Sequence, residues 1–381
     1  MFTLLSKSLL LPAIVLACFG CSNADDSLDP DLENSLRGIV SQNQEEFGVP
    51  GIVAGVWIPD RGNLIIESGV ADLEAGTEIR KEDHFRIGSI TKSFTVTVIL
   101  QLAEAGLVSL DDPVSNYVPL AGNGDATIGE LANMRSGIFN YTEDPDFVLG
   151  FIQDFLQPYT DQEIVDIGDR NAPYFPHGEG WHYSNTGTVI LGMIVEQVTG
   201  NPLGQEIENR ILKPLELNHT SYPTTPDLPP PFALGYGFDP IQELSFANPS
   251  SASGSGAMIS RLEDLKIWGE VLGKGLLLSP DTQAARLASL QPIVFSPCDD
   301  NDPDRPKRNC PEYDRYGYGF GEISGWIGHT AEFLGYTALV MYEPNSESTV
   351  VILCNIFGTG THVPTDIFRE FAAVLNPQLG I

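Results

Sequence analysis

The fold is decided by two apolar runs near the C-terminus, YTALVM at residues 336–341 and TVVIL at residues 349–353. Both runs are rich in β-branched residues, and a turn-forming Pro-Asn-Ser sequence lies between them at 344–346. Runs of this length on either side of a turn are typical of paired antiparallel strands. We therefore expect a strand pair here, and residues 365–375 are expected to close the chain as a helix.

The other end of the chain offers the same kinds of element. GIVAGVW at 51–57 and LII at 64–66 predict a second strand pair across a turn at 59–62. Residues 33–47 predict a helix with one apolar face. The middle of the chain instead shows helical pieces, such as 188–199, separated by loops rich in Pro and Gly.

These patterns together predict an α/β (α+β) fold. A mostly antiparallel sheet, built from both chain ends, is expected to be flanked by helices and to carry an inserted helical domain. Residues 32–106 and 251–381 form the expected sheet domain, and residues 107–250 form the expected helical domain.

The composition bounds the classes of function. The 381 residues are 42% hydrophobic and 19% charged, which is enough apolar material for a sizeable core. Acidic residues outnumber basic ones by 51 to 20, and the formal net charge is −31. This charge argues against a nucleic-acid partner, because phosphate contacts need a surplus of Lys and Arg. It also argues against docking on an anionic membrane through a basic patch.

The N-terminal residues have the pattern of an export signal. Residues 1–17 are expected to be a signal peptide, because Lys7 precedes an apolar run at 9–17 that is too short to span a bilayer. The protein is therefore expected outside the cytoplasm, as a periplasmic or cell-surface lipoprotein or as a secreted protein.

The lipoprotein alternative rests on VLAC at 15–18, which resembles a bacterial lipoprotein cleavage box with Cys18 as the lipidated residue. Cys21 offers a second register, and residues 18–31 would form an acidic tether. Ordinary export without a lipid is the competing interpretation, and the only contact with a membrane is expected to be this anchor.

Two further cysteines, Cys298 and Cys310, flank a polar loop at 299–309. Outside the cytoplasm they are candidates for a disulfide, which would stabilise the fold by about 3 kcal/mol in the chain-entropy model. Cys354 follows an apolar run and is expected to be a buried, inert thiol.

The first candidate for chemistry is SITK at residues 89–92, which is followed by an apolar helical stretch. Ser89 and Lys92 are three residues apart, so a helix places them on one face. A serine at a helix N-terminus meets the positive end of the macrodipole, and a partly desolvated lysine can accept its proton. The pattern is weak alone, since a helix cap beside a surface lysine gives the same spacing.

Two other motifs are candidates for the same site. Tyr183 and Asn185 form the only Tyr-x-Asn in the chain; a phenol near a cation can hold a depressed pKa and act as a general base, and the asparagine can bind an acyl amide. His329 and Thr330 precede the strand at 336–341, where a basic residue and a hydroxyl would line one wall of a cleft. Taken singly, both motifs are more often structural.

The three motifs, in this order, resemble those of the serine β-lactamase and penicillin-binding protein superfamily. The chain is most similar to class C β-lactamases and the soluble, low-molecular-mass DD-carboxypeptidases. The likeness covers about residues 33 to 378 and implies a β-lactamase/transpeptidase-like fold. The segments that carry it are FRIGSITKSF at 85–94, MRSGI at 134–138, YSNTG at 183–187 and GSGAMIS at 254–260 with EDL at 263–265.

The resemblance implies a role for each residue. Ser89 is the acylated nucleophile and Lys92 its proton partner, while Tyr183 is the base that also protonates the leaving group. Asn185 holds the acyl side of the substrate. His329, with Thr330 beside it, takes the place of the basic residue of the third motif. The oxyanion hole is formed by the backbone N–H groups of Ser89 and Glu332.

Two departures from the family pattern concern the substrate's terminus. Ala331 and Glu332 stand where a glycine and often a hydroxyl residue are usual, and Gly321, followed by Glu322, aligns with the arginine by which carboxypeptidases receive a terminal carboxylate. If Glu332 points into the cleft, it repels such a carboxylate. We therefore expect neutral esters or amides to be cleaved faster than peptides that end in free D-Ala.

The sequence-based interpretation is an exported serine hydrolase that forms an acyl-enzyme on Ser89. It would cleave amide or ester bonds in a small-molecule or peptide substrate, as β-lactamases, DD-carboxypeptidases or esterases do. The alternative is a penicillin-binding sensor or a pseudo-enzyme that does not turn over. No metal-ligand spacing and no phosphate-binding loop is evident, so no cofactor and no metal are expected.

Overall fold

The computed structural model describes residues 27–238, 240–293 and 313–380. The predicted signal peptide, the lipidation candidates Cys18 and Cys21, and the Cys298–Cys310 pair lie outside these residues. In the described part the first helix, α1 (Pro30–Phe47), begins inside the segment expected to be a tether. The Asp29 side chain caps this helix by accepting hydrogen bonds from the backbone N–H groups of Asp31 and Leu32, at 3.0 and 3.3 Å.

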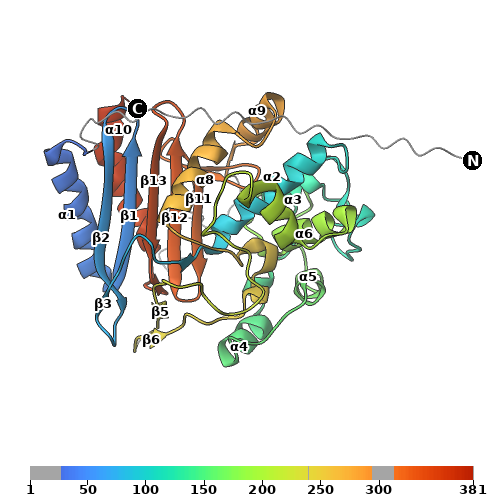
Figure 1. Ribbon diagram of the computed structural model, residues 1–381. Coiled ribbons are helices and arrows are strands. Elements are labelled where there is room, and N and C mark those ends of the chain that lie inside the picture. The colour runs from blue at the N-terminus through green and yellow to red at the C-terminus, as the bar shows by residue number, and fades with distance from the viewer. Residues whose placement is uncertain (1–26, 239, 294–312, 381) are drawn as a thin grey trace, which may run out of the picture.

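The centre of the molecule is a nine-stranded sheet with the order β3-β2-β1-β13-β12-β11-β10-β9-β8, in which all neighbours pair antiparallel. Strands from the two ends of the chain meet where β1 pairs with β13 (Figure 1). The strands are β1 (Gly51–Ile58), β2 (Gly62–Asp72), β3 (Thr77–Glu78), β8 (Gln291–Pro292), β9 (Arg315–Tyr316), β10 (Gly321–Ile323), β11 (Trp326–Phe333), β12 (Tyr336–Glu343) and β13 (Ser348–Cys354).

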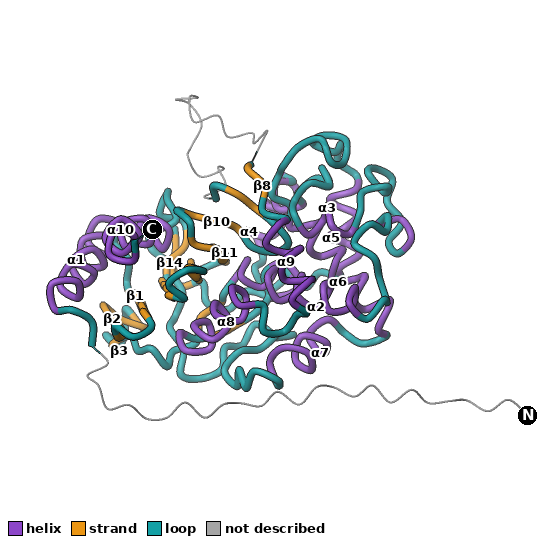
Figure 2. Tube along the Cα trace, turned by 90° about the horizontal axis from the view of Figure 1, so that it is seen from above, coloured by secondary structure: helices purple, strands orange, loops and turns teal. Residues whose placement is uncertain are grey.

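The two faces of this sheet are buried by different helices. One face packs against α1 and α10 (Val363–Leu379), and its side chains belong to an apolar core shared with both helices. The other face packs against α8 (Leu262–Lys274), which contacts β12 and β13. Figure 2 shows α1 and α10 together on one side of the strands and α8 on the other. Central strands buried on both faces explain why their sequences are continuously apolar.

The middle of the chain supplies most of the remaining helices, which gather beside the sheet (Figure 1). The apolar core on the α8 side of the sheet continues without a break into this helical part, through side chains of α2 and α6. The helices are α2 (Thr91–Glu104), α3 (Ile128–Ala132), α4 (Pro145–Gln153), α5 (Asp161–Asp169), α6 (Asn185–Thr199), α7 (Leu203–Ile207) and α9 (Pro280–Ala288).

Short strands join the helical part to the sheet. The pair β4–β7 holds the segment that leads into α2, and the three-stranded sheet β14-β5-β6 lies beyond the end of β13. These strands are β4 (Phe85–Arg86), β5 (Tyr236–Gly237), β6 (Gln242–Glu243), β7 (Ile259–Ser260) and β14 (Ile356–Phe357).

The predicted fold class is confirmed: the sheet is antiparallel, both chain ends build it, and helices flank it. The two predicted strand pairs and both terminal helices are present, with bounds that extend the predicted ones by a few residues. The division into domains at residues 106 and 250 stays a prediction. Within the described ranges, no helix combines the length and apolarity needed to cross a bilayer.

Candidate active site

The nucleophile candidate lies where β4 ends and α2 begins. A single 3-10 turn, Gly88–Ile90, carries Ser89 into the start of the helix. One helical turn later, the Nζ atom of Lys92 lies 3.0 Å from Ser89 Oγ and donates a second hydrogen bond, 2.8 Å long, to the carbonyl oxygen of Ser255. The spacing of the motif therefore does what the sequence predicts: it brings the serine and lysine side chains into contact.

Lys92 is completely buried, with a relative exposure of 0%. Its polar neighbours are a hydroxyl and a carbonyl, and loss of solvation lowers the pKa of its ammonium group well below the usual value of 10.5. A lysine in this environment favours the neutral amine. It is then able to accept the proton of Ser89.

Tyr183 completes this cluster from the opposite side. Its ring faces Lys92, with Nζ 4.7 Å from the ring centroid, and its hydroxyl hydrogen-bonds to Ser89. The expected depression of the Tyr183 pKa is wrong. Although part of the side chain is exposed, loss of solvation around the hydroxyl raises its pKa well above 10, with Tyr313 adding to the rise. Lys92 meets the face of the ring and does not counter this effect.

Asn185 is placed by the start of α6. Ser184 caps that helix, because its hydroxyl accepts a 3.4 Å hydrogen bond from the backbone N–H of Gly187. The Asn185 amide nitrogen Nδ2 donates to Thr142 Oγ1 at 3.1 Å, and its backbone N–H donates to Asn140 Oδ1 at 3.0 Å. The loop before α4 thus holds Asn185 beside Tyr183, as a group that binds the acyl amide of a substrate needs.

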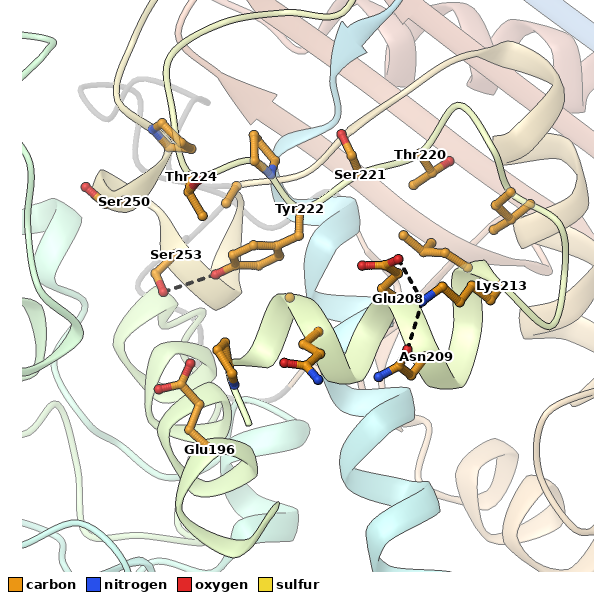
Figure 3. Close-up of a pocket in the computed structure, with 18 of the residues that line it drawn as sticks. Glu196, Glu208, Asn209, Lys213, Thr220, Ser221, Tyr222, Thr224, Ser250 and Ser253 are labelled. Atoms are coloured by element: carbon orange, nitrogen blue, oxygen red, sulfur yellow. Dashed lines mark hydrogen bonds and ion pairs between the residues drawn. The ribbon is translucent and has the colours of Figure 1, made fainter. Parts of the chain in front are cut away.

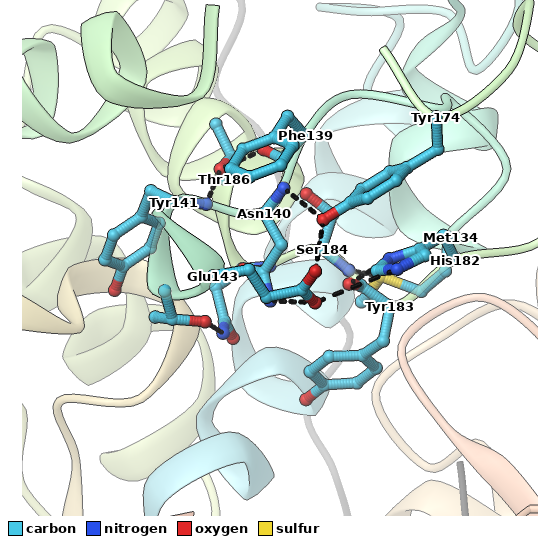
Figure 4. Close-up of polar contacts among 12 residues, drawn as sticks. Met134, Phe139, Asn140, Tyr141, Glu143, Tyr174, His182, Tyr183, Ser184 and Thr186 are labelled. Carbon is cyan, nitrogen blue, oxygen red and sulfur yellow. Dashed lines mark hydrogen bonds and ion pairs between the residues drawn. The ribbon is translucent and has the colours of Figure 1, made fainter. Parts of the chain in front are cut away.

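A second polar network supports this loop (Figure 4). The Glu143 carboxylate accepts hydrogen bonds from the Tyr174 hydroxyl at 2.7 Å and from the Asn140 amide at 3.2 Å. His182 stacks on Tyr174 with ring centroids 3.5 Å apart, and its Nε2 lies 3.8 Å from Glu143. These contacts hold in place Asn140, which bonds to Asn185, and His182, which lies three residues before Asn185 in the chain.

The third motif lies on β11, the strand that faces the nucleophile turn. His329 is fully buried, with its Nε2 2.9 Å from the Tyr316 hydroxyl and its Nδ1 3.0 Å from the Tyr313 hydroxyl. Burial, together with the nearby Lys92, lowers the pKa of His329 to about 3. The imidazole is therefore neutral at pH 7, and it supplies hydrogen bonds and no positive charge, although it takes the place of the basic residue of the third motif.

Thr330, next along β11, is tied to the same tyrosine. Its backbone N–H donates to Tyr313 Oη at 2.8 Å, and the two hydroxyl oxygens are 2.8 Å apart. Tyr313 therefore bridges both residues of the motif. The sequence analysis missed this role, and it missed the partnership of Tyr316 with His329, because nothing in the local sequence marks a tyrosine 13 or 16 residues upstream as a histidine partner.

The residue before Ser89 lies directly against Glu332, the second residue expected to form the oxyanion hole. A Cβ atom on Gly88 would lie 2.7 Å from the carbonyl oxygen of Glu332, and Gly88 has a φ of +39°. Both facts require glycine before Ser89. The backbone of Gly88, which directly precedes Ser89, therefore lies against the backbone of Glu332. That the N–H groups of Ser89 and Glu332 form an oxyanion hole stays a prediction.

The sequence analysis placed Glu332 and Gly321 around a substrate's terminal carboxylate, and Arg315 lies on the strand next to Gly321. The Glu332 side chain is exposed, so solvent screens its charge, and we expect it to repel a terminal carboxylate less strongly than a buried carboxylate would. At Gly321, a side chain would overlap the ring of Tyr313, which occupies that space. Arg315, in turn, donates to the Leu290 carbonyl oxygen at 2.8 Å and pairs with Glu322 at 3.3 Å.

A cavity of about 990 Å³ is lined by α6, α7 and loop segments within residues 217–224 and 249–257 (Figure 3). Its lining includes Glu196, Tyr222 and Ser253, and the Tyr222 hydroxyl lies 3.3 Å from Ser253 Oγ. The turn that begins at Ser253 ends at Ser255, whose carbonyl oxygen accepts a hydrogen bond from Lys92, so this turn separates the cavity from Lys92. None of the predicted site residues lines the cavity. Within the described residues, no group of three or more potential metal ligands is present.

Comparison with known proteins agrees with this geometry. The profile of the family described as "Beta-lactamase" matches residues 36–375. Penicillin-binding protein 4* of Bacillus subtilis is 24% identical over 311 residues, which cover 75% of this chain and 64% of the relative. The chain thus spans less than two thirds of the length of this curated relative.

Two solved structures share the architecture over nearly their whole length. A D-stereospecific amidohydrolase from Streptomyces sp. superposes with a TM-score of 0.73 at 30% identity, covering 90% of this chain and 97% of that one. A D-amino acid amidase from Ochrobactrum anthropi SV3, complexed with L-phenylalanine, superposes with a TM-score of 0.78 at 23% identity, covering 91% and 99%. The second of these likenesses is one of fold.

Proposed function

The chain belongs to the β-lactamase family, and from this membership we propose that it is a serine hydrolase that forms an acyl-enzyme on Ser89 and cleaves neutral amides or esters. The observation that carries the proposal is the contact between Ser89 Oγ and the Nζ atom of Lys92, at 3.0 Å, in a site where burial lowers the lysine pKa. A surface lysine beside a helix cap would keep its usual pKa and would activate nothing.

Acylation follows from these positions. Ser89 Oγ attacks the substrate carbonyl carbon and forms a C–O bond, while its proton passes to the neutral amine of Lys92. The negative charge on the carbonyl oxygen is stabilised by the N–H groups of Ser89 and Glu332. When the tetrahedral intermediate collapses, the C–N or C–O bond to the leaving group breaks. The Tyr183 hydroxyl gives that group its proton and is reprotonated from Lys92.

Deacylation reverses the proton path. A water molecule attacks the ester carbonyl, and its proton passes to Lys92, which is again neutral. The bond between the acyl carbon and Ser89 Oγ breaks, Lys92 returns the proton to the serine oxygen, and the carboxylic acid leaves. In this scheme Lys92 is the base and Tyr183 is the acid. This scheme moves the role of base from Tyr183, to which the family resemblance assigned it, to Lys92, because burial lowers the pKa of Lys92 and raises that of Tyr183; the role of Tyr183 as the acid that protonates the leaving group stays.

For the substrate we propose the neutral amide of a D-amino acid, in place of a peptide with a free C-terminal carboxylate. Support comes from the similar Streptomyces amidohydrolase, which is named as D-stereospecific. Support also comes from this site itself: His329 is neutral, and Arg315 is already paired with Glu322. A leaving group that carries a free carboxylate would therefore meet no compensating positive charge from His329 or from Arg315.

We also propose that the protein is exported and lipidated on Cys18, on the strength of the VLAC sequence alone. Fractionation of cells tests this proposal. The wild-type protein should sediment with membranes, and a variant with both Cys18→Ala and Cys21→Ala should be released. Unchanged fractionation of the double variant would contradict the lipid anchor.

The hydrolase proposal is tested by a fluorophosphonate probe and a chromogenic ester. Mass spectrometry should locate one adduct on Ser89, lost in Ser89→Ala and retained in Ser250→Ala, a serine that lines the separate cavity. Steady turnover after the first acylation supports an enzyme. A stoichiometric burst without turnover would instead establish the sensor, and an adduct that survives Ser89→Ala would refute the nucleophile.

A further inference from the structure

One edge of β11 is uncovered beside the nucleophile turn. β12 pairs with β11 along nearly its whole length, but β10 covers the opposite edge only from Trp326 to Gly328. Beyond Gly328, no strand in the described part of the chain pairs with this edge. Farther along β11, the backbone of Glu332 lies against Gly88, the residue before Ser89. The uncovered edge therefore leads from β10 toward the nucleophile.

The backbone N–H groups of Thr330 and Glu332 share this edge. The Thr330 N–H donates to the Tyr313 hydroxyl at 2.8 Å, and the Tyr313 ring lies over Gly321 of β10, so this N–H points to the side that β10 leaves uncovered. The N–H groups of a strand alternate between its two edges, so that of Glu332 points the same way. Two strand residues span about 7 Å. The Tyr313 hydroxyl thus caps the edge two residues before the N–H group expected in the oxyanion hole.

The leaving group of the substrate lies toward Thr330. In the proposed mechanism Tyr183 gives the leaving group its proton, and the Tyr183 ring lies 6.3 Å from the ring of His329, the residue before Thr330. An extended amino-acid residue spans about 3.5 Å. A leaving group one residue long therefore extends from the oxyanion hole into the stretch of edge that Tyr313 caps. Ammonia or methanol ends short of that stretch.

Tyr313 fills this stretch with a fixed side chain. Its ring occupies the space beside Gly321, where a Cβ atom would overlap the ring. Its hydroxyl lies 2.8 Å from Thr330 Oγ1 and 3.0 Å from His329 Nδ1. Only 7% of Tyr313 is exposed, so the surrounding residues hold the ring in place. The N–H and hydroxyl of Thr330, which could bind a longer leaving group, are both bonded to Tyr313.

We propose that Tyr313 is a specificity-determining residue that closes the leaving-group side of the site. The leaving group is then restricted to a small, uncharged one, so the substrates are primary amides and esters of small alcohols, and bonds followed by a further amino-acid residue are cleaved poorly. The inference rests on the proposed acyl-enzyme on Ser89 and adds the class of leaving group to it.

The test compares three substrates that share D-phenylalanine as the acyl part: D-phenylalaninamide, D-phenylalanine methyl ester and D-Phe-D-Ala amide. Chromatography of the released D-phenylalanine gives kcat/KM for each. The dipeptide amide has an uncharged leaving group, so its comparison with the primary amide measures size without charge. The wild-type protein should cleave the primary amide about 100-fold faster than the dipeptide amide, because the longer leaving group meets a filled space.

Two variants of Tyr313 divide this effect. In Tyr313→Ala the ratio of the two kcat/KM values should fall to about tenfold or less, because cleavage of the dipeptide amide becomes faster. Tyr313→Phe keeps the ring and deletes the hydroxyl, so the ratio should fall only about threefold, as the N–H and hydroxyl of Thr330 become available to the leaving group. A purely structural role would lower kcat/KM for all three substrates together and leave the ratio unchanged.

Tyr318→Ala is the matched control. Tyr318 lies on the same segment of the chain as Tyr313 but packs against the other large apolar core. The same loss of a tyrosine side chain there should therefore keep the wild-type ratio.

The outcomes separate the inference from the proposed function. Equal cleavage of the primary amide and the dipeptide amide by the wild type overturns the inference and leaves the hydrolase intact, as does a wild-type ratio in both variants of Tyr313. If circular dichroism shows that Tyr313→Ala is unfolded, the change expected in Tyr313→Phe decides alone. Hydrolysis of a chromogenic ester without hydrolysis of D-phenylalaninamide or its methyl ester also overturns the inference. No Ser89-dependent hydrolysis of any of these compounds overturns both.

Discussion

Lys92 lies on α2, which forms the helical wall of the site, and His329 lies on β11, which forms its strand wall. Both residues are basic and fully buried, and the hydrogen bonds described above join them to hydroxyl and carbonyl groups. Burial lowers the pKa of both, yet the consequences differ. The pKa of the lysine is lowered well below its usual 10.5, whereas the pKa of the histidine is lowered from 6.5 to about 3. One becomes available as a base, and the other loses its ability to carry charge.

The comparison shows that the same desolvation creates a proton acceptor or removes one, depending on the starting pKa of the group. The hydrogen-bond partners of Lys92 and His329 also differ. Lys92 faces the hydroxyl that must lose a proton, while His329 lies between two tyrosine hydroxyls that hold it in place. The following predictions test this contrast between the two walls, beginning with the largest expected effect.

The largest effect is expected from Lys92. Lys92→Arg keeps a cation that cannot deprotonate, and Lys92→Met keeps the length while removing the amine, so both should lower the acylation rate by about 1,000- to 10,000-fold. Stopped-flow measurement of the burst with a chromogenic ester gives this rate. Near-normal acylation in Lys92→Met, with the fold confirmed by circular dichroism, would show that Lys92 is not the base.

The pH dependence of the wild type sharpens the same prediction. Since Lys92 must be neutral to act, kcat/KM should rise with pH along a limb whose apparent pKa lies well below 10.5. The folded-state pKa is below the unfolded one, so the unfolded state binds more protons between the two values, and the free energy of unfolding should rise with pH across that window. Denaturation of Lys92→Met at several pH values should show this slope reduced.

Tyr183→Phe should cost about 100-fold in kcat/KM, because the leaving group loses its acid while the base remains. The ring of Phe preserves the packing against Lys92. The distinguishing measurement is the pH profile, whose rising limb should persist in the variant. If the limb disappears with the hydroxyl, Tyr183 is the base after all, and the roles implied by the family resemblance hold.

His329→Gln is expected to lower kcat/KM only by about tenfold, because an amide can replace some of the hydrogen bonds to Tyr313 and Tyr316 and no charge is lost. Above pH 4 the profile should keep its shape, since a group with a pKa of about 3 stays neutral there. A wild-type limb near pH 6 that vanishes in His329→Gln would instead mean that the histidine titrates during catalysis.

The sequence predicted the helical wall better than the strand wall, and the reason is physical. Ser89 and Lys92, or Tyr183 and Asn185, are close in the chain, so their spacing alone brings them together once the helix or loop forms. His329 takes its chemistry from Tyr313 and Tyr316, and the position of these tyrosines follows from the pairing of β9, β10 and β11. Pairing across strands is set by tertiary structure, which a local pattern does not encode.

The fold shows the same distinction. Continuous apolar runs predicted the central strands β1, β12 and β13, because burial on both faces requires them. The two-residue strands β4 and β7 carry no such signal, although they anchor the segment before Ser89. The pKa of Tyr183 likewise depends on burial, and its sequence context suggested the opposite direction from the one that the packing produces.

The smallest effect concerns Glu332 and returns to the strand wall. An inward carboxylate would have repelled a substrate's terminal carboxylate by several kcal/mol, but the Glu332 side chain is exposed and its charge is screened by solvent. Exposed pairs of charges are worth about 0.2–1 kcal/mol, so Glu332→Gln should speed the cleavage of a D-Ala-D-Ala peptide by only about two- to fivefold. The C-terminal amide of the same peptide serves as the uncharged control and should be unaffected. The amide should still be the better substrate of the variant, because neutral His329 and the paired Arg315 offer a carboxylate no free cation. A large gain for the free acid would place Glu332 against the substrate, and a wild-type preference for the free acid would reveal a carboxylate receptor in the site.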